Sequence, residues 1–227
     1  SIVQPAFASA PGGGYLDVMT LSQQGTHTVV VDPDVWAVGS ATVKLHNVPG
    51  DLAETTTPGG DPVTVTTTAP GQNAVVSFTA SAGQRVSVKL NGITMAATTV
   101  RLRRPDGATI AGPVNGYGPS GFAFLDAITL PSAGVHTILV DTSTNSTGSA
   151  TVKVHQVADA TGPIAPDGSA TAAVNSVPGQ NVALSFEGVA GQRVSATIAP
   201  SLTGDVSGSG QGTLYLLAPN GSQLGSA

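Results

Sequence analysis

The stretch Tyr15–Val48, YLDVMTLSQQGTHTVVVDPDVWAVGSATVKLHNV, recurs at Phe124–Val157 as FLDAITLPSAGVHTILVDTSTNSTGSATVKVHQV. The two stretches align without a gap at an offset of 109, and 17 of their 34 positions are identical. A second pair, Pro70–Leu90 and Pro178–Ile198, aligns at an offset of 108 with 12 identities in 21 positions. Self-similarity at a fixed spacing is typical of repeat proteins. The sequence therefore predicts tandem repeats with a period of about 109.

This repeat divides the chain into three parts. Residues 51–157 form one complete copy, residues 1–50 match the second half of a copy, and residues 158–227 match the first half of a further copy. Half a β-sandwich exposes unpaired strand edges and an open apolar face. We therefore expect each half to be completed by the continuing chain or by a neighbouring copy in a head-to-tail filament. Closure of both halves within one chain, as a circularly permuted second domain, is the alternative, but the intact middle copy lies between them.

Alternating apolar and polar residues mark the strands of the complete copy. In Arg85–Leu90, for example, every second side chain is apolar, and Gly-bearing turns such as Pro105-Asp106-Gly107 separate one strand from the next. Seven or eight short strands with no helical period predict an all-β fold, an antiparallel, jelly-roll-like β-sandwich. The strands are expected at Val63 with Val65, Ala74–Ala80, Arg85–Leu90, Thr99–Arg103, Phe122–Leu130, His136–Val140 and Ser149–His155.

Composition and charge exclude several classes of protein. Only 9% of the residues are charged, so the chain lacks the signature of intrinsic disorder. The net charge is −5, and the single basic cluster, Arg101–Arg104, alternates with inward-facing Val100 and Leu102, so we expect no nucleic-acid binding. There is no cysteine for disulfides or thiolate sites. No apolar run approaches the roughly 18–20 residues that span a bilayer, so no membrane span is predicted.

The residues that could carry chemistry form no catalytic pattern. The four histidines fall at equivalent places in two copies, with His27 and His136 on the predicted inward face and His46 and His155 on the outward face. Opposite faces argue against a metal pair within one copy. No Gly-x-Ser-x-Gly elbow stands between a strand and a helix, and the carboxylates form no acid–base pair. We therefore expect no enzymatic activity and no cofactor.

Carboxylates at strand ends suggest a calcium site. Asp32, Asp34 and Asp141 follow strand ends, where carboxylate and carbonyl oxygens suit a hard cation. The second copy has Ser143 where the first has Asp34, so the two copies do not share one ligand set. These three aspartates are the candidate metal ligands.

A further carboxylate recurs on a predicted inward face. Asp17 and Asp126 share a register with apolar residues such as Phe124 and Ile128. A buried carboxylate needs a partner, or a bulge that turns it outward. Because both copies retain the residue, we expect a shared structural role such as a backbone contact.

The order of the motifs resembles one bacterial family. The pieces are Pro70–Asn73, Ala82–Val86, Pro105–Gly107, Phe124–Asp126 and Gly134–Thr137, in that order. Together they are similar to the bacterial pre-peptidase C-terminal domain, a β-sandwich module appended to secreted peptidases and repeated in large extracellular proteins. The resemblance implies a non-catalytic module, secreted or exposed on the cell surface, and relatives of this kind can bind calcium.

The chain departs from that family in one place, and two functions follow from the resemblance. The family's usual aromatic after the glycine of one strand is histidine here, at His27 and His136. Repetition with little charge favours a structural segment, such as a filament, stalk or spacer of a long extracellular protein. The alternative is an accessory module that binds polysaccharide or collagen through exposed aromatics. The loop aromatics Trp36 and Tyr117 are the candidates, and neither has a counterpart in the other copy.

Overall fold

The computed structural model describes residues 13–33, 35–116, 118, 121–142, 144–202 and 212–226. This part of the chain is all-β, as predicted, with thirteen strands. It divides into two compact units. The first contains the residues up to 160 together with 175–181, and the second contains 161–174 and the residues from 182 onward. Within the described residues, no helix is long and apolar enough to cross a membrane.

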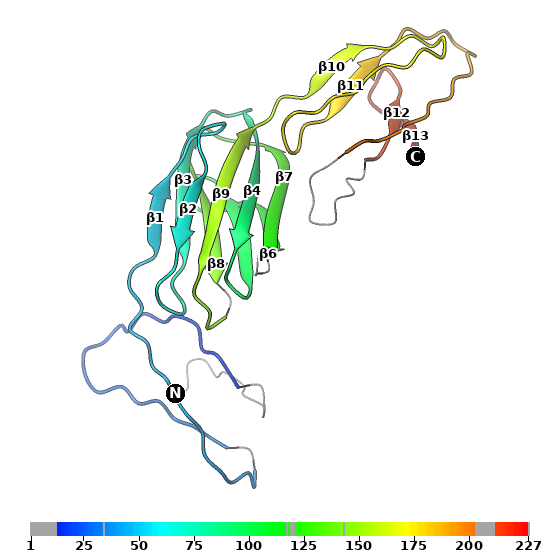
Figure 1. The fold of residues 1–227 in the computed structure, drawn as a ribbon. Coiled ribbons are helices and arrows are strands. Elements are labelled where there is room, and N and C mark those ends of the chain that lie inside the picture. Colours follow the sequence, from blue (N-terminus) through cyan, green and yellow to red (C-terminus); the bar gives the residue numbers. More distant parts are fainter. Residues whose placement is uncertain are drawn as a thin grey trace. The chain divides into compact units, whose positions relative to one another are not determined.

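Two sheets face each other in the first unit (Figure 1). One sheet has the strand order β1-β3-β8-β5-β6, and the other has the order β2-β9-β4-β7. The pairs β3–β8, β5–β8, β5–β6, β4–β7, β4–β9 and β2–β9 are antiparallel, whereas β1 runs parallel to β3. The strands are β1 (Leu52–Thr55), β2 (Val63–Thr66), β3 (Ala74–Ala80), β4 (Arg85–Ile93), β5 (Thr98–Arg103), β6 (Thr109–Gly116), β7 (Gly121–Thr129), β8 (Gly134–Thr142) and β9 (Ser149–Gln156).

All seven predicted strands are present, and β3 has the predicted bounds. The sequence did not predict β1 and β6, so the copy has nine strands rather than seven or eight. β1 is only four residues long, which is too short to show alternation, and Gly112-Pro113 interrupts the pattern of β6. The parallel β1–β3 pair also departs from the wholly antiparallel prediction.

The core lies between the two sheets and is aliphatic. The predicted inward faces of β4, β5 and β9 are confirmed, because each of their alternating apolar side chains is at most 1% exposed. These side chains are Val86, Val88 and Leu90, then Val100 and Leu102, then Ala150, Val152 and Val154. Their exclusion from water is the dominant stabilising contribution to such a domain.

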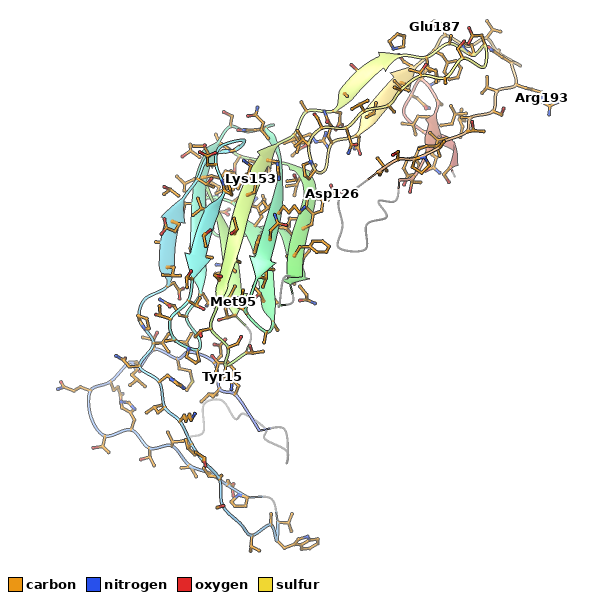
Figure 2. The ribbon with its side chains drawn as sticks, in the orientation of Figure 1. Tyr15, Met95, Asp126, Lys153, Glu187 and Arg193 are labelled. Carbon is orange, nitrogen blue, oxygen red and sulfur yellow. The ribbon has the colours of Figure 1, made fainter. Side chains whose placement is uncertain are left out.

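Strand β7 differs from its prediction in which face it buries. Ala123 and Leu125 point into the core, whereas Phe124 was expected there. The register shifts between the pairs Val86–Ile128 and Val88–Leu125, which inserts an extra residue into β7. This β-bulge turns Asp126 to the exposed face, as Figure 2 shows, and so no carboxylate is buried at this position.

The strand order interleaves the two halves of the copy. The first half, residues 52–116, supplies β1 to β6, and the second half, residues 121–156, supplies β7 to β9. β8 lies between β3 and β5, β9 lies between β2 and β4, and β7 pairs with β4. Among the described residues, no second-half strand pairs with another strand of that half, whereas β1–β3 and β5–β6 are pairs within the first half.

The remaining described residues contain few strands. No strand forms in residues 14–33 or 35–51. The second unit holds two small sheets, in which β10 (Ala160–Pro163) pairs with β11 (Val182–Ser185) and β12 (Tyr215–Leu217) pairs with β13 (Gln223–Ser226). The pair Leu216–Gly225 of β12–β13 corresponds to Leu102–Ala111 of β5–β6, and both sheets have an irregularity beside it.

Candidate functional site

A turn packs on the outer face of the β2-β9-β4-β7 sheet. We call residues 175–181 the docked turn; it belongs to the first compact unit. Ser87 lies on the side of β4 that alternation predicts to face solvent, yet it is fully buried. Its hydroxyl donates a hydrogen bond of 2.6 Å to the carbonyl oxygen of Pro178. The docked turn therefore covers this part of the sheet.

Gly179 allows the close approach of this turn. Its φ is +84°, in the left-handed region that favours glycine. A Cβ at this position would lie 3.1 Å from Asp126 Oδ1 and from Ser87 Cβ, and 3.2 Å from Ala127 Cβ. The bulge of β7 and the glycine of the docked turn thus fit against each other.

Gln180 fixes the shape of the docked turn. Its Oε1 accepts hydrogen bonds from the backbone N–H of Ser176 at 2.7 Å and from the Ser176 hydroxyl at 3.3 Å. Its Nε2 donates to the carbonyl oxygen of Ala158 at 2.8 Å. One side chain thus links the two ends of the turn to the chain that leaves β9.

Asp159 anchors the end of the docked turn to β4. Its Oδ1 accepts a hydrogen bond of 3.0 Å from the backbone N–H of Asn181, and its Oδ2 pairs with Arg85 Nη1 at 2.6 Å. The bond from Arg85 and that from Asn181 hold the pKa of the Asp159 carboxyl below its usual range. Because hydrogen bonds to an ionised group are the stronger kind, this carboxylate connects the linker, the turn and the sheet.

The internal contacts of the docked turn recur 108 positions earlier in the chain, around Gln72. Gln72 accepts a bond from the Thr68 N–H at 2.8 Å and donates to the Gly50 carbonyl oxygen at 2.9 Å. The Asp51 carboxylate accepts a bond of 3.1 Å from the Asn73 N–H. We call residues 67–73, which correspond to this arrangement, the upstream turn.

The upstream turn also contacts the preceding segment through its glycine. Gly71 has a φ of +84°, and a Cβ there would lie 3.0 Å from the Tyr15 hydroxyl and 3.2 Å from Val18 Cβ. Val18 aligns with Ala127, which lies against Gly179. Both glycines therefore approach the same aligned position of the copy before them.

The recurring aspartates Asp17 and Asp126 have the same local geometry. Each accepts a 2.7 Å hydrogen bond through Oδ1 from the backbone N–H of the following residue. The expected backbone contact is present in both. Tyr15 also donates to Asp17 at 3.2 Å, and burial together with this carboxylate raises the pKa of Tyr15 to about 12.

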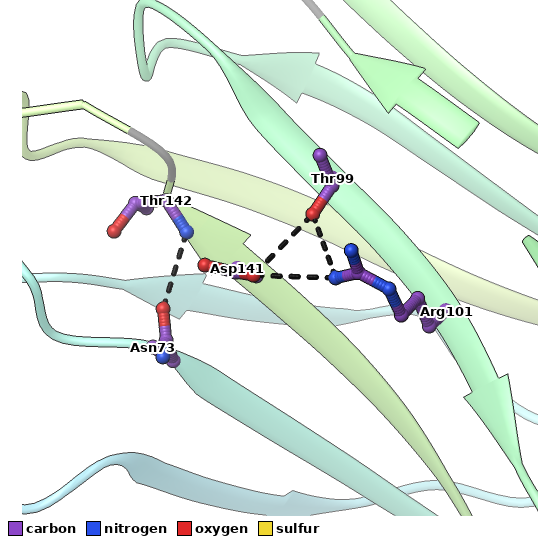
Figure 3. Close-up of polar contacts among 5 residues, drawn as sticks. All are labelled: Asn73, Thr99, Arg101, Asp141 and Thr142. Carbon is purple, nitrogen blue, oxygen red and sulfur yellow. Dashed lines mark hydrogen bonds and ion pairs between the residues drawn. The ribbon is translucent and has the colours of Figure 1, made fainter. Parts of the chain in front are cut away.

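Two polar contacts tie the upstream turn to the end of β8, and Figure 3 shows the one between Thr142 and Asn73. The Thr142 N–H donates to Asn73 Oδ1 at 3.2 Å, and its hydroxyl donates to the Gln72 carbonyl oxygen at 3.1 Å. Beside them, Asp141 Oδ2 pairs with Arg101 Nη1 at 3.2 Å and accepts a bond from Thr99. This end of the sandwich is fixed by polar groups.

In the described part of the chain, the three candidate calcium ligands do not lie together. Asp32 is exposed, Asp34 lies outside the described residues, and Asp141 is paired with Arg101. Across the ranges that the structure describes, no group of three His, Cys, Asp or Glu side chains is placed to hold a metal ion. A calcium ion held by these aspartates stays a prediction.

The histidines occupy different environments. His136 is fully buried, as its inward position predicts, and stacks on Phe78 with ring centroids 5.6 Å apart. His27 was also expected inward, but it is exposed, and none of the strands that the structure describes covers it. His155 is half-buried on β9, and burial, with the charges of Lys153 and Lys89, lowers its pKa.

Sequence reasoning did not identify the docked turn as a contact site. The motif Pro-Gly-Gln-Asn, at Pro70–Asn73 and Pro178–Asn181, was interpreted only as a turn that separates strands. The available signal was an aspartate 22 residues before each asparagine, at Asp51 and Asp159. This spacing could be interpreted only from the structure, in which the chain folds back so that the aspartate accepts the N–H of the asparagine.

Comparisons with known proteins give structural similarities alone. No protein-family model matches the sequence, and no curated protein matches it. PliG, a periplasmic inhibitor of g-type lysozyme from Aeromonas hydrophila, is 20% identical over 45% of this chain and 99% of that chain, with a TM-score of 0.30. The pre-peptidase C-terminal domain of a collagenase from Bacillus anthracis is 13% identical over 48% of this chain and 99% of that chain, with a TM-score of 0.35. The family that the sequence motifs resemble is thus also represented among the solved structures to which this chain is similar.

Proposed function

We propose that the chain is a non-catalytic structural segment of a long extracellular or cell-surface bacterial protein, built from tandem β-sandwich repeats. The observation that carries this proposal is the turn contact that recurs once per repeat, around Gln72 and around Gln180. In each place a glutamine closes the turn, an aspartate accepts its last N–H, and a glycine lies against the preceding copy. The extracellular location follows from the resemblance of the sequence motifs.

A reused contact of this kind suits a spacer or stalk. In repeat proteins each unit contacts its neighbours, and stability is shared through those contacts. The docked turn buries Ser87 and pairs Arg85 with Asp159 across the boundary between aligned copies. In this proposal the role of these residues is to join one repeat to the next.

Detection of the native protein tests the proposal. An antibody raised against residues 51–157 should recognise a polypeptide on intact source cells, removable by external protease, with a mass well above the 22.3 kDa of this chain. An intracellular protein of about this mass would contradict it. A cytosolic marker protein that survives the protease controls for cell lysis.

Binding to polymers is the second candidate, favoured by one observation. The Trp36 side chain is 88% exposed, and exposed aromatic rings suit stacking on sugars or collagen. Pull-down with insoluble polysaccharides and collagen separates the two functions. The spacer role predicts no saturable binding, whereas saturable binding that Trp36→Ala removes would establish the accessory module.

A further inference from the structure

The outer face of the β2-β9-β4-β7 sheet brings two lysines together. Lys89 on β4 and Lys153 on β9 are direct partners in the register of these strands. Each lies between buried apolar residues of its own strand, so its side chain projects from the outer face. Side chains directly opposite each other have Cβ atoms about 4.5–5.5 Å apart, and like charges at this distance repel. The chain contains three lysines, and this pair includes two of them.

Among the described residues, no carboxylate forms an ion pair with either lysine. The three ion pairs of this part of the chain use Arg85, Arg101 and Arg104. On the same side of the sheet, Asp159 is held by Arg85, and Asp126 bonds to the backbone of its own strand. The lysine pair is therefore a local concentration of positive charge in a chain whose net charge is −5.

A third basic side chain lies beside the pair. His155 follows Lys153 by two residues on the same face of β9 and is half-buried. Burial, with the charges of Lys153 and Lys89, lowers its pKa, so the positive field of the lysines opposes its protonation. An anion bound at the lysines would weaken that field and raise the pKa of His155.

The neighbours of the lysine pair suit a sugar ring. Phe124 on β7 is the partner of Lys89 on its other side, and it is partly exposed. In the next row of the sheet, Asn91 pairs with Thr151, whose hydroxyl lies 3.1 Å from that of Thr64. An aromatic face suits stacking on a sugar, and amide and hydroxyl groups can bond to sugar hydroxyls.

Lys153 is held in position and keeps donors for a ligand. Its Nζ donates a hydrogen bond to the carbonyl oxygen of Gly60, which restrains a long and flexible side chain. An ammonium group has three N–H donors, so two remain. Two ammonium groups side by side can bond to the two oxygens of one carboxylate, and such charge-assisted bonds are the stronger kind.

We propose that the surface formed by Lys89, Lys153, His155 and Phe124, here called the cationic surface, binds an acidic polysaccharide built of uronic acids. The sugar carboxylate lies between the two lysines, and a sugar ring lies on Phe124. A phosphate polymer without rings would leave Phe124 unused, so a carboxylated sugar fits the surface better. This proposal goes beyond the spacer role and does not depend on it.

Binding of polygalacturonate to the full chain tests the proposal. Biolayer interferometry should show saturable binding that weakens as salt is added, because salt screens exposed charges. Lys89→Gln should weaken binding by more than about tenfold, since bonds to a charged group are lost. Lys44→Gln is the matched control, because it removes the same charge from an exposed position in a segment without strands. The control should bind as the unaltered chain does.

Two further measurements locate the bound sugar. The pKa of His155, followed by NMR, should rise when polygalacturonate is added and stay unchanged with uncharged dextran. Phe124→Leu keeps an apolar side chain but removes the ring, and it should weaken binding by about two- to tenfold. Far-UV circular dichroism of each variant checks that the middle sandwich is folded.

Several results would overturn the inference. One is the absence of saturable binding to polygalacturonate. Another is an equal loss in Lys89→Gln and Lys44→Gln, which would make the attraction a general effect of charge. Equal affinity for polyphosphate or DNA would show that the ring and the hydroxyls play no part. Loss of binding in Trp36→Ala alone would place the contact at that loop instead. The mass and location of the native protein test the spacer role separately.

Discussion

His136 is a polar residue in an apolar core. Its ring is fully buried against Phe78, and its Nδ1 lies 3.3 Å from the Gly134 carbonyl oxygen. Its Nε2 is buried with no hydrogen-bond partner among the described residues. An unpaired buried nitrogen costs about 1–3 kcal/mol. The position therefore suits an aromatic hydrocarbon better than an imidazole.

We expect His136→Phe to stabilise the middle sandwich by about 1 kcal/mol, because the stacking partner remains and the unpaired nitrogen is removed. Urea denaturation followed by far-UV circular dichroism measures the change. His136→Ala is the control and should destabilise, since it leaves a cavity beside Phe78. A less stable phenylalanine variant would show that the imidazole makes a favourable contact.

Gly179→Ala should release the docked turn. The substitution meets both a strained φ, which costs about 1–2 kcal/mol for a residue with Cβ, and three atoms within 3.2 Å. Gly83→Ala is the matched control, because Gly83 has a φ of +81° and open space where its added Cβ would lie. Amide hydrogen exchange of Asn181 should accelerate in the first variant only. Equal exchange rates of Asn181 in the two variants would mean that the close contact at Gly179 does not hold the docked turn on the sheet.

At the scale of the elements, the outer face of β4 supports the docked turn. Arg85 and Ser87 both point toward it, one through Asp159 and the other through the Pro178 carbonyl oxygen. The bulge in β7 opens the neighbouring surface for Gly179. Two strands and one linker thus form a single contact surface.

This contact should respond to acid through Asp159. Because the folded pKa of this carboxyl is lowered, its stabilising effect is complete above the ordinary carboxyl pKa of about 3.9 and is lost as pH falls through the folded value. The Asn181 amide resonance, followed by NMR, should therefore titrate with a midpoint below about 3.9. Arg85→Gln should move the midpoint upward, and Asp159→Asn should abolish the titration. If Arg85→Gln left the midpoint unchanged, the role given to the Arg85–Asp159 ion pair would be contradicted.

Equivalent leucines in the two copies should differ in their effect on stability. Leu130→Ala removes a fully buried side chain and should cost about 2–5 kcal/mol. Leu21→Ala changes an exposed side chain and should stay within about 0.5 kcal/mol in the single chain. Urea denaturation of dilute protein measures both. A large loss in Leu21→Ala under these conditions would show that its face is already covered.

The sequence predicted strands well where alternation is long, as in β3, β4 and β9. It missed β1, which is defined by its pairing with β3, because a four-residue strand carries little pattern. It also assigned Phe124 to the core, since strict alternation cannot foresee the bulge at Asp126. The buried position of Ser87 depends on a turn far along the chain, as its bond to Pro178 shows. Such long-range contacts leave no local signature.

At the scale of the whole molecule, the strands from the two halves of the middle sandwich depend on each other for pairing. The pairs that form within a first half are present in both units, whereas, among the described strands, pairs between halves are present only in the middle copy. Whether an aligned segment of the described chain forms strands therefore depends on whether its partner strands are present beside it. Intrinsic strand propensity, which is similar in aligned segments, does not by itself determine whether the strands form.

The interleaved strand order also governs how the protein is made. Thr64 of β2 bonds to Thr151 of β9, which the ribosome adds 87 positions later. At about 5–20 residues per second, that partner arrives roughly 4–17 s after Thr64. Until β9 has been synthesised, the β2-β9-β4-β7 sheet cannot form in full, and the nascent sandwich stays open.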